Sequence, residues 1–529
     1  MRRAFLALMA LIATVGLITT AQAQKGGDDA VSDDPPSVQP SASEFSKILR
    51  ENLTSGAVFK NLQDLQDIAD ANKGNRSSGQ PGYDKSASYV AKTLKSYGWD
   101  VKREKFNFDA FFQDAPSVFE RTTPNPRVFA EETEFSTMEF SGSGDVTGEL
   151  VAVDLTIPPA AEPSSSSGCE ASDFTGLNLT GKVALMQRGT CDFSVKVKNA
   201  AAAGAAATVI FNEGQEGRTD VVFGTLGTPD ITIPAVDTSF AIGSELAGGV
   251  LSGPTGTTVR IKTTTRTENL STENVIAETP GGNAKNVVMA GAHLDSVIDG
   301  PGMNDNGSGA AALLAIAKQI SDSGVEPTNK IRFGWWGAEE EGLVGSTDYV
   351  AGLKKKELAK IALYLNFDMI GSSNFARLIY DGDGDAFDSE GPKGSDKIEA
   401  TLEKFFKKEK LATGPTQFDG RSDYLAFIDS GIPSGGLFTG AEEVKTAKEA
   451  KLYGGKAGEP LDPCYHQKCD DIDNVSRKAI KQMVPAIADS VARYAMDTSA
   501  IGGKGGGKKG RRAATGSSSG DYLGNKLAR

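Results

Sequence analysis

Both histidines of the 529-residue sequence lie among carboxylates, in patterns that could bind metal ions. His293 lies in the stretch GAHLDSVIDGPGMNDNGSG, shortly before Asp305, and His466 lies in DPCYHQKCDD. Neutral imidazoles and carboxylates suit Zn²⁺, with Co²⁺ or Mn²⁺ as substitutes. Two such ions that share one carboxylate, about 4 Å apart, can activate water for hydrolysis. The residue types therefore predict a dinuclear hydrolytic centre, with Asp305 placed to bridge the metals.

Further carboxylates follow apolar segments that we interpret as strands. Glu339 and Glu340 come after KIRFGWWGA, Asp368 ends LYLNFD, and His293 ends NVVMAGAH. In open α/β sheets, ligands bind outside the carboxyl ends of the strands, so these groups are expected to converge on one crevice. A single histidine or acidic turn is more often an ordinary polar feature. The prediction therefore rests on the conjunction of these residues.

The elements that must position these residues read as an α/β fold. Residues 267–498 alternate strand and helix candidates, which predicts a mixed, largely parallel twisted sheet with helices on both faces. Residues 45–114, helical and then extended, are predicted to be the first part of the same domain. Between residues 115 and 266, short apolar strands alternate with Gly, Ser and Thr, which indicates a small mixed-β domain inserted into the larger one.

The net charge and the two ends of the chain predict where the protein acts and which partners it lacks. The formal net charge of −13 argues against nucleic acid as a partner. Residues 1–23 have a basic start, an apolar run and Ala-Gln-Ala, which predicts a secretory signal peptide, with an uncleaved anchor helix as the alternative. Residues 24–44 read as a linker or pro-segment, and residues 499–529 as a disordered basic tail rich in Gly and Ser. We expect a secreted, extracellular monomer that has no membrane contact once the signal is removed.

The four cysteines fit an oxidising, exported setting. Three pairings are conceivable. We favour the local one, Cys169 with Cys191 and Cys464 with Cys469, because each of these pairs brackets one compact segment.

Five motifs occur in an order that identifies a family. They are AHLDSVIDGPGMNDNGSG, WWGAEEEGLVGS, NFDMIGS, GRSDYLAF and CYHQKCD. Together they closely resemble the secreted bacterial di-zinc aminopeptidases of peptidase family M28, the Streptomyces-type leucyl aminopeptidases, strongly over about residues 270–498 and more weakly over 45–112. The stretch GKVALMQRGTCDFSVKVKNAAAAGAAATVIFNE resembles the protease-associated (PA) domain that is inserted in many of these enzymes.

The resemblance implies a zinc-exopeptidase fold, which is phosphorylase/hydrolase-like, and roles for individual residues. Two Zn²⁺ ions would share Asp305, one held also by His293 and Asp368, the other by Glu340 and His466. Glu339 would be the general base, Asp295 would orient the His293 imidazole, and the Tyr465 hydroxyl would stabilise the oxyanion. In relatives the peptide bond after the bridging aspartate is often cis. Some relatives also bind Ca²⁺, for which the resemblance assigns no residues here.

The resemblance also implies peptide substrates with a free N-terminus. Glu339 and Asp368, with backbone near Arg421, would recognise the α-amine. Met369, Phe438 and Tyr465 match positions that line the apolar side-chain pocket of relatives, so large apolar N-terminal residues such as Leu, Met and Phe are the expected substrates. Ordinary core packing is the alternative for Met369 and Phe438.

Four other functions compete with the aminopeptidase. A glutaminyl cyclase-like enzyme would use a similar ligand set with a single zinc. A carboxypeptidase would be expected to show a basic pocket for a C-terminal carboxylate. A non-catalytic, receptor-like binding protein of the same fold would lack metal ligands, and none of the five is missing here. Simple metal storage would not need Glu339.

Overall fold

The computed structural model describes residues 39–387 and 389–502. The predicted signal peptide, most of the predicted linker and most of the basic tail lie outside these ranges. Among the described residues, no helix is long and apolar enough to cross a membrane.

Three helices precede the first strand: α1 (Ala42–Asn52), α2 (Ser55–Asp70) and α3 (Pro81–Ser96). The Ser41 hydroxyl accepts from the Glu44 amide while Glu44 reaches back, which satisfies amides that the first helical turn leaves free. Proline begins α3, where its missing N–H costs nothing. Gly98, with φ of 84°, turns the chain into the following strand. The apolar faces of these helices join the main hydrophobic core.

The larger part of the chain is built on a mixed sheet with the strand order β13-β12-β14-β11-β9-β10-β8. Its strands are β8 (Gly253–Glu278), β9 (Asn283–His293), β10 (Asn329–Trp336), β11 (Ile361–Phe367), β12 (Leu378–Tyr380), β13 (Gly414–Thr416) and β14 (Ser434–Phe438). The central strands β10, β9, β11 and β14 are parallel. β8 pairs antiparallel with β10, and β12 pairs antiparallel with β14 and parallel with β13. This arrangement confirms the predicted mixed, largely parallel sheet.

Helices cover both faces of this sheet. The main core packs α6 (Ser308–Asp322), α9 (Ser395–Lys408) and α12 (Arg477–Met496) with the three N-terminal helices. A second core gathers side chains of α7 (Val344–Gly352) and α10 (Tyr424–Asp429) around Trp336 and Tyr364. Two short helices, α8 (Lys355–Leu358) and α11 (Ala447–Tyr453), complete this part of the fold.

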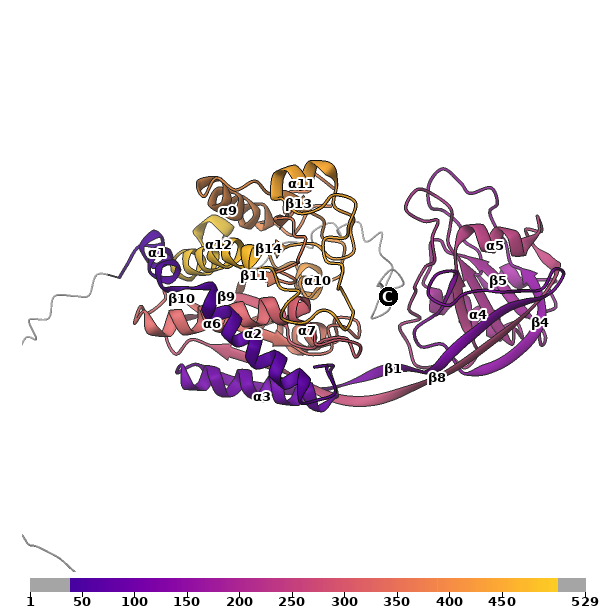
Figure 1. Cartoon of the computed structure of the whole chain (residues 1–529), viewed down its shortest axis with the longest axis horizontal. Coiled ribbons are helices and arrows are strands. Elements are labelled where there is room, and N and C mark those ends of the chain that lie inside the picture. The colour runs from indigo at the N-terminus through magenta and orange to yellow at the C-terminus, as the bar shows by residue number, and fades with distance from the viewer. Residues whose placement is uncertain (1–38, 388, 503–529) are drawn as a thin grey trace, which may run out of the picture. The chain divides into compact units, whose positions relative to one another are not determined.

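The predicted insertion forms its own β-structure with two cores of its own. Its elements are β2 (Arg127–Val128), β3 (Phe135–Thr137), β4 (Gly144–Ala152), β5 (Val183–Gln187), α4 (Phe193–Ala202), β6 (Ala207–Phe211), β7 (Ala235–Thr238) and α5 (Phe240–Ala247). Strands β4 to β7 are parallel, and β3 pairs antiparallel with β7. β1 (Asp100–Thr123) and β8 pair antiparallel from Asp100 opposite Glu278 to Thr123 opposite Thr258, and the two ribbons can be followed side by side in Figure 1. The predicted domain boundaries, at 114/115 and 266/267, lie within these two strands.

Both predicted disulfides are present, Cys169–Cys191 and Cys464–Cys469. The described part of the chain contains no free cysteine. The second disulfide closes the loop that carries Tyr465 and His466.

Candidate active site

Three adjacent parallel strands, β9, β10 and β11, end at the same edge of the sheet. Each of them ends in or is followed by a candidate ligand, with Glu340 shortly after β10. His293 is the last residue of β9 and pairs in register with Trp336, the last residue of β10. Asp368 follows directly after β11. Because β9 lies between β10 and β11, the carboxyl ends of the three strands place their polar side chains together.

Asp305 lies between the two histidines. Its Oδ1 is 2.9 Å from His293 Nε2, and its Oδ2 is 3.1 Å from His466 Nε2. On one side, Asp368 Oδ1 is 3.3 Å from His293 Nε2; on the other, Glu340 Oε2 is 3.0 Å from His466 Nε2. All five side chains are buried. Each oxygen of the Asp305 carboxylate thus lies beside one imidazole, and each imidazole also lies beside one further carboxylate.

This donor set fits divalent cations. The ligand atoms of His293, Asp305 and Glu340 lie within 4.8 Å of one another, and so do those of His293, Glu339 and Asp368. Glu340 Oε1 and Asp368 Oδ1 are buried and have no hydrogen-bond partner among the described residues. Buried carboxylate oxygens without partners are costly unless a cation satisfies them. The mixture of imidazole and carboxylate donors matches zinc.

The pKa values of His466 and Glu340 also reflect the many carboxylates gathered at this site. Burial lowers the pKa of His466, but Glu340 and Asp305 outweigh burial and raise it to about 10. Burial raises the pKa of Glu340 to about 7. In the absence of metal, protons are therefore held where cations would bind.

Asp295 contacts both His293 and the backbone of Glu339 and Glu340. Its backbone oxygen is 3.2 Å from His293 Nδ1, and its carboxylate Oδ1 is 3.6 Å from the same nitrogen. The Asp295 carboxylate also accepts the backbone N–H groups of Glu339 and Glu340, at 3.3 and 3.4 Å. Asp295 thus contacts the imidazole of one candidate ligand and holds the backbone of another. The peptide bond from Asp305 to Asn306 is cis, as the resemblance predicted.

Arg421 reaches the site through its side chain as well as its backbone. Its guanidinium donates to Glu442 Oε1 at 2.6 Å and to the Tyr465 hydroxyl at 3.4 Å, whereas its backbone N–H donates to Asp419. Burial raises the pKa of Tyr465 well above its usual value, so its hydroxyl stays protonated. Because this hydroxyl oxygen accepts from Arg421, its own proton is available to a substrate atom.

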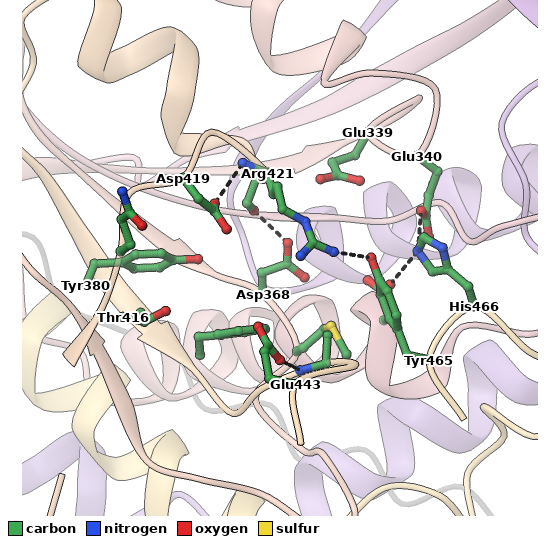
Figure 2. Close-up of a pocket in the computed structure, with 16 residues that line it drawn as sticks. Glu339, Glu340, Asp368, Tyr380, Thr416, Asp419, Arg421, Glu443, Tyr465 and His466 are labelled. Atoms are coloured by element: carbon green, nitrogen blue, oxygen red, sulfur yellow. Dashed lines mark hydrogen bonds and ion pairs between the residues drawn. The ribbon is translucent and has the colours of Figure 1, made fainter. Parts of the chain in front are cut away.

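A pocket of about 610 Å³, open solvent included, adjoins the candidate metal-ligand side chains (Figure 2). Met369, Phe438 and Tyr465, the residues expected to form an apolar pocket, all line it. Together with Ala441 they form a small apolar cluster of their own.

Several buried residues that contribute to the site were not singled out from the sequence. Asp470 accepts the backbone N–H groups of Asn304 and Asp305, and Ser422 donates to Asp368 Oδ2 at 2.6 Å. The Arg76 side chain is fully buried and donates to the backbone oxygens of Leu294, Pro301 and Gly302. Ser422 and Asp470 lie in or beside motifs quoted above and could have been found there. Nothing local marks Arg76, which is far from its partners in sequence.

Asp423, next to Ser422, is a further buried carboxyl that the sequence reasoning left unassigned. Burial raises its pKa to about 8, and the charge of Asp423 in turn contributes to the raised pKa of Glu339, in which burial is the largest cause.

Comparisons with known proteins decide the family. The model of peptidase family M28 matches residues 274–491, and that of the PA domain matches residues 146–246. An aminopeptidase of Pseudomonas aeruginosa is 43% identical over 472 residues, which cover 85% of this chain and 82% of that protein. This chain belongs to peptidase family M28.

Other similar proteins are aminopeptidases as well. A probable lipoprotein aminopeptidase of Mycobacterium tuberculosis is 43% identical over 87% of this chain and 88% of its own length, and leucine aminopeptidase 2 of Arthroderma otae is 41% identical over 85% of each. Among solved structures, the aminopeptidase from Aneurinibacillus sp. strain AM-1 aligns with a TM-score of 0.65 at 27% identity, over 85% of this chain and 94% of its own. The predicted enzyme class, an aminopeptidase of family M28 with a PA domain, is confirmed by these findings.

Proposed function

We propose that this M28 aminopeptidase is a di-zinc enzyme that removes large apolar residues, such as Leu, Met and Phe, from peptides with a free N-terminus. The observation that carries the proposal is the position of Asp305, whose two carboxylate oxygens each lie beside one histidine, while each histidine lies beside one further carboxylate. His293, Asp305 and Asp368 would hold one ion, and Glu340, Asp305 and His466 the other. A zinc aminopeptidase of Bacillus subtilis shares the fold, with a TM-score of 0.55 at 24% identity.

Zinc and Glu339 have different roles in the proposed reaction. When bound, zinc supplies Lewis acidity, which lowers the pKa of water and polarises a carbonyl. Glu339 Oε2 lies 3.9 Å from His293 Nε2, at the edge of the ligand set. Burial raises the pKa of Glu339 well above its usual value, which suits a group that takes a proton from water and returns it to the leaving amine.

Two further interactions orient the substrate. The carboxylates of Glu339 and Asp368 accept hydrogen bonds from the α-ammonium group, so the enzyme requires a free N-terminus. The Tyr465 hydroxyl, held by Arg421, donates to the oxygen on which negative charge develops. Met369, Phe438 and Ala441 contact the side chain of the N-terminal residue and exclude water from it.

The sequence supports three further parts of this proposal: the enzyme is secreted, it acts as a monomer, and its domains have the limits predicted above.

Blocking the substrate amine tests the proposed function. Leu-p-nitroanilide should be hydrolysed and N-acetyl-Leu-p-nitroanilide should not, and a zinc-specific chelator should abolish turnover that added Zn²⁺ restores. Equal turnover of the two substrates would refute the role of the α-amine. Cyclisation of an N-terminal glutamine without hydrolysis of either anilide would point to a glutaminyl cyclase.

A further inference from the structure

The pocket beside the metal ligands has two chemically different parts. One part is apolar and contains Met369, Phe438 and Ala441. The other part is polar, and its lining residues include Tyr380, Thr416, Gln417 and Asp419. Figure 2 shows Asp419, Tyr380 and Thr416 on one side of the pocket and Glu340 and His466 on the opposite side.

Asp419 is held in a fixed position. Its Oδ1 accepts the backbone N–H of Arg421 at 3.0 Å and the hydroxyl of Tyr424 at 2.7 Å. The neighbouring Phe418 stacks on Tyr380 with ring centroids 5.0 Å apart and packs edge-on against Tyr424. A carboxylate fixed in this way loses little conformational entropy when a ligand binds to it.

One oxygen of Asp419 has no partner. Among the described residues, Asp419 Oδ2 accepts no hydrogen bond and Asp419 forms no ion pair. The cation beside it, Arg421, is engaged by Glu442 at 2.6 Å. Asp419 is also exposed, so it stays accessible from the pocket.

Glu443 contributes less negative charge to the pocket. Its Oε2 accepts the backbone N–H of Ala441 at 2.7 Å, so it is used to hold the loop. Burial and the neighbouring Glu442 raise the pKa of Glu443, which favours its neutral form. Asp419 is therefore the carboxylate best placed to contact a charged side chain.

We propose that Asp419 determines specificity for basic N-terminal residues, and that lysine is a substrate alongside the large apolar residues. The inference rests on the proposed aminopeptidase function. A lysine side chain matches both parts of the pocket because its methylene stem is apolar and its ammonium group is charged. The stem packs against Met369 and Phe438, and the ammonium group donates to Asp419 Oδ2.

Norleucine isolates the contribution of the ammonium group, because its side chain has the same four carbons as lysine and no ammonium group. The measurement is kcat/KM for Lys-, norleucine- and Leu-p-nitroanilide with the zinc-loaded full chain, in the wild type, Asp419→Asn and Asp385→Asn. The amide oxygen of Asp419→Asn keeps the acceptor for Arg421 and Tyr424, so the loop stays in place. Asp385 is exposed and does not line the pocket, so Asp385→Asn is the matched loss of one surface charge.

We expect the Lys-to-norleucine ratio of kcat/KM to fall about fivefold in Asp419→Asn, the size of one partly exposed ion pair. Asp385→Asn should leave the ratio unchanged, and salt should lower the wild-type ratio but not that of Asp419→Asn. An unchanged ratio in Asp419→Asn, or a wild type that cleaves Leu but not Lys, would overturn the specificity role alone. A wild type that cleaves none of the three substrates would instead overturn the proposed aminopeptidase function.

Discussion

Removing the Cys464–Cys469 disulfide should weaken zinc binding rather than simply destabilise the fold. The disulfide joins residues with a sequence separation of 5 and encloses Tyr465 and His466. His466 has φ of 56°, a left-handed conformation that non-glycine residues adopt at a cost of about 1–3 kcal/mol. The loop must therefore be held closed for His466 to present its Nε2 to Glu340 and Asp305.

The loop length gives the magnitude of the effect. Closing a loop this short costs about 2 kcal/mol of chain entropy, and the disulfide closes the loop before zinc binds. Without the disulfide, zinc binding itself would have to close the loop. The affinity for the zinc ion that we propose His466 binds should then drop on the order of 30-fold. Hydrogen bonds such as those from Asn474 to Asp462 and Asp470 also order the ends of the loop, so this value is an upper estimate.

The second disulfide provides the control. Cys169–Cys191 closes a longer loop, with a sequence separation of 22, and the same reasoning gives it about 3 kcal/mol. The assay compares zinc affinity, Leu-p-nitroanilide turnover and thermal unfolding of two double variants, Cys464→Ala/Cys469→Ala and Cys169→Ala/Cys191→Ala. The first should lose zinc affinity and turnover, which excess zinc partly restores. The second should lower the melting temperature of the inserted domain and keep zinc affinity. Zinc affinity within twofold of wild type in the first variant would refute the reasoning.

Three further predictions follow from the same structure. Asp295→Asn retains one acceptor for the two amides that Asp295 now serves, so zinc affinity or kcat/KM should fall about 10- to 100-fold, and wild-type values of both would contradict its supporting role. Leu314→Ala in the fully buried core of α6 should lower the free energy of unfolding by about 2–5 kcal/mol in a denaturant titration, and a loss under 1 kcal/mol would show that the core repacks. In the chelated protein the pKa of His466 is raised from 6.5 to about 10, so the folded state keeps a proton that the unfolded chain releases, and stability should fall as pH rises across that window. Thermal melts of zinc-free protein check this, and a melting temperature that rises from pH 7 to 9 would contradict it.

Local patterns made the fold predictable from the sequence, together with the side chains that meet at the candidate site. Each apolar strand ends in its polar residue at a fixed place, so the convergence of His293, Glu340 and Asp368 follows from the geometry of a parallel sheet. His466 follows no strand and is placed by a disulfide-closed loop, so its position depended on the family resemblance. The residue types already predicted Asp305 as a bridge, and the resemblance assigned the other ligands of each ion.

Contacts between distant segments were not predictable. Arg76 lies before the inserted domain and donates to backbone oxygens after it, and backbone acceptors leave no trace in a residue pattern. No motif in the sequence marks Asp419, whose position depends on the hydroxyl of Tyr424 and on the packing of the adjacent Phe418 against Tyr380 and Tyr424. The predicted domain limits lie inside β1 and β8 because these paired strands continue from one β-structure into the other. Near the first limit, between Gln113 and Val118, the pairing only shifts its register.

Metal content and Leu-p-nitroanilide turnover, measured on the wild type and Glu339→Ala, test the central claim most directly. The account predicts two zinc ions per chain in both proteins, with turnover in Glu339→Ala reduced about 10²- to 10⁴-fold, the usual contribution of a general base. A single zinc in the wild type, or a Glu339→Ala variant that keeps its zinc and turns over at the wild-type rate, would contradict it.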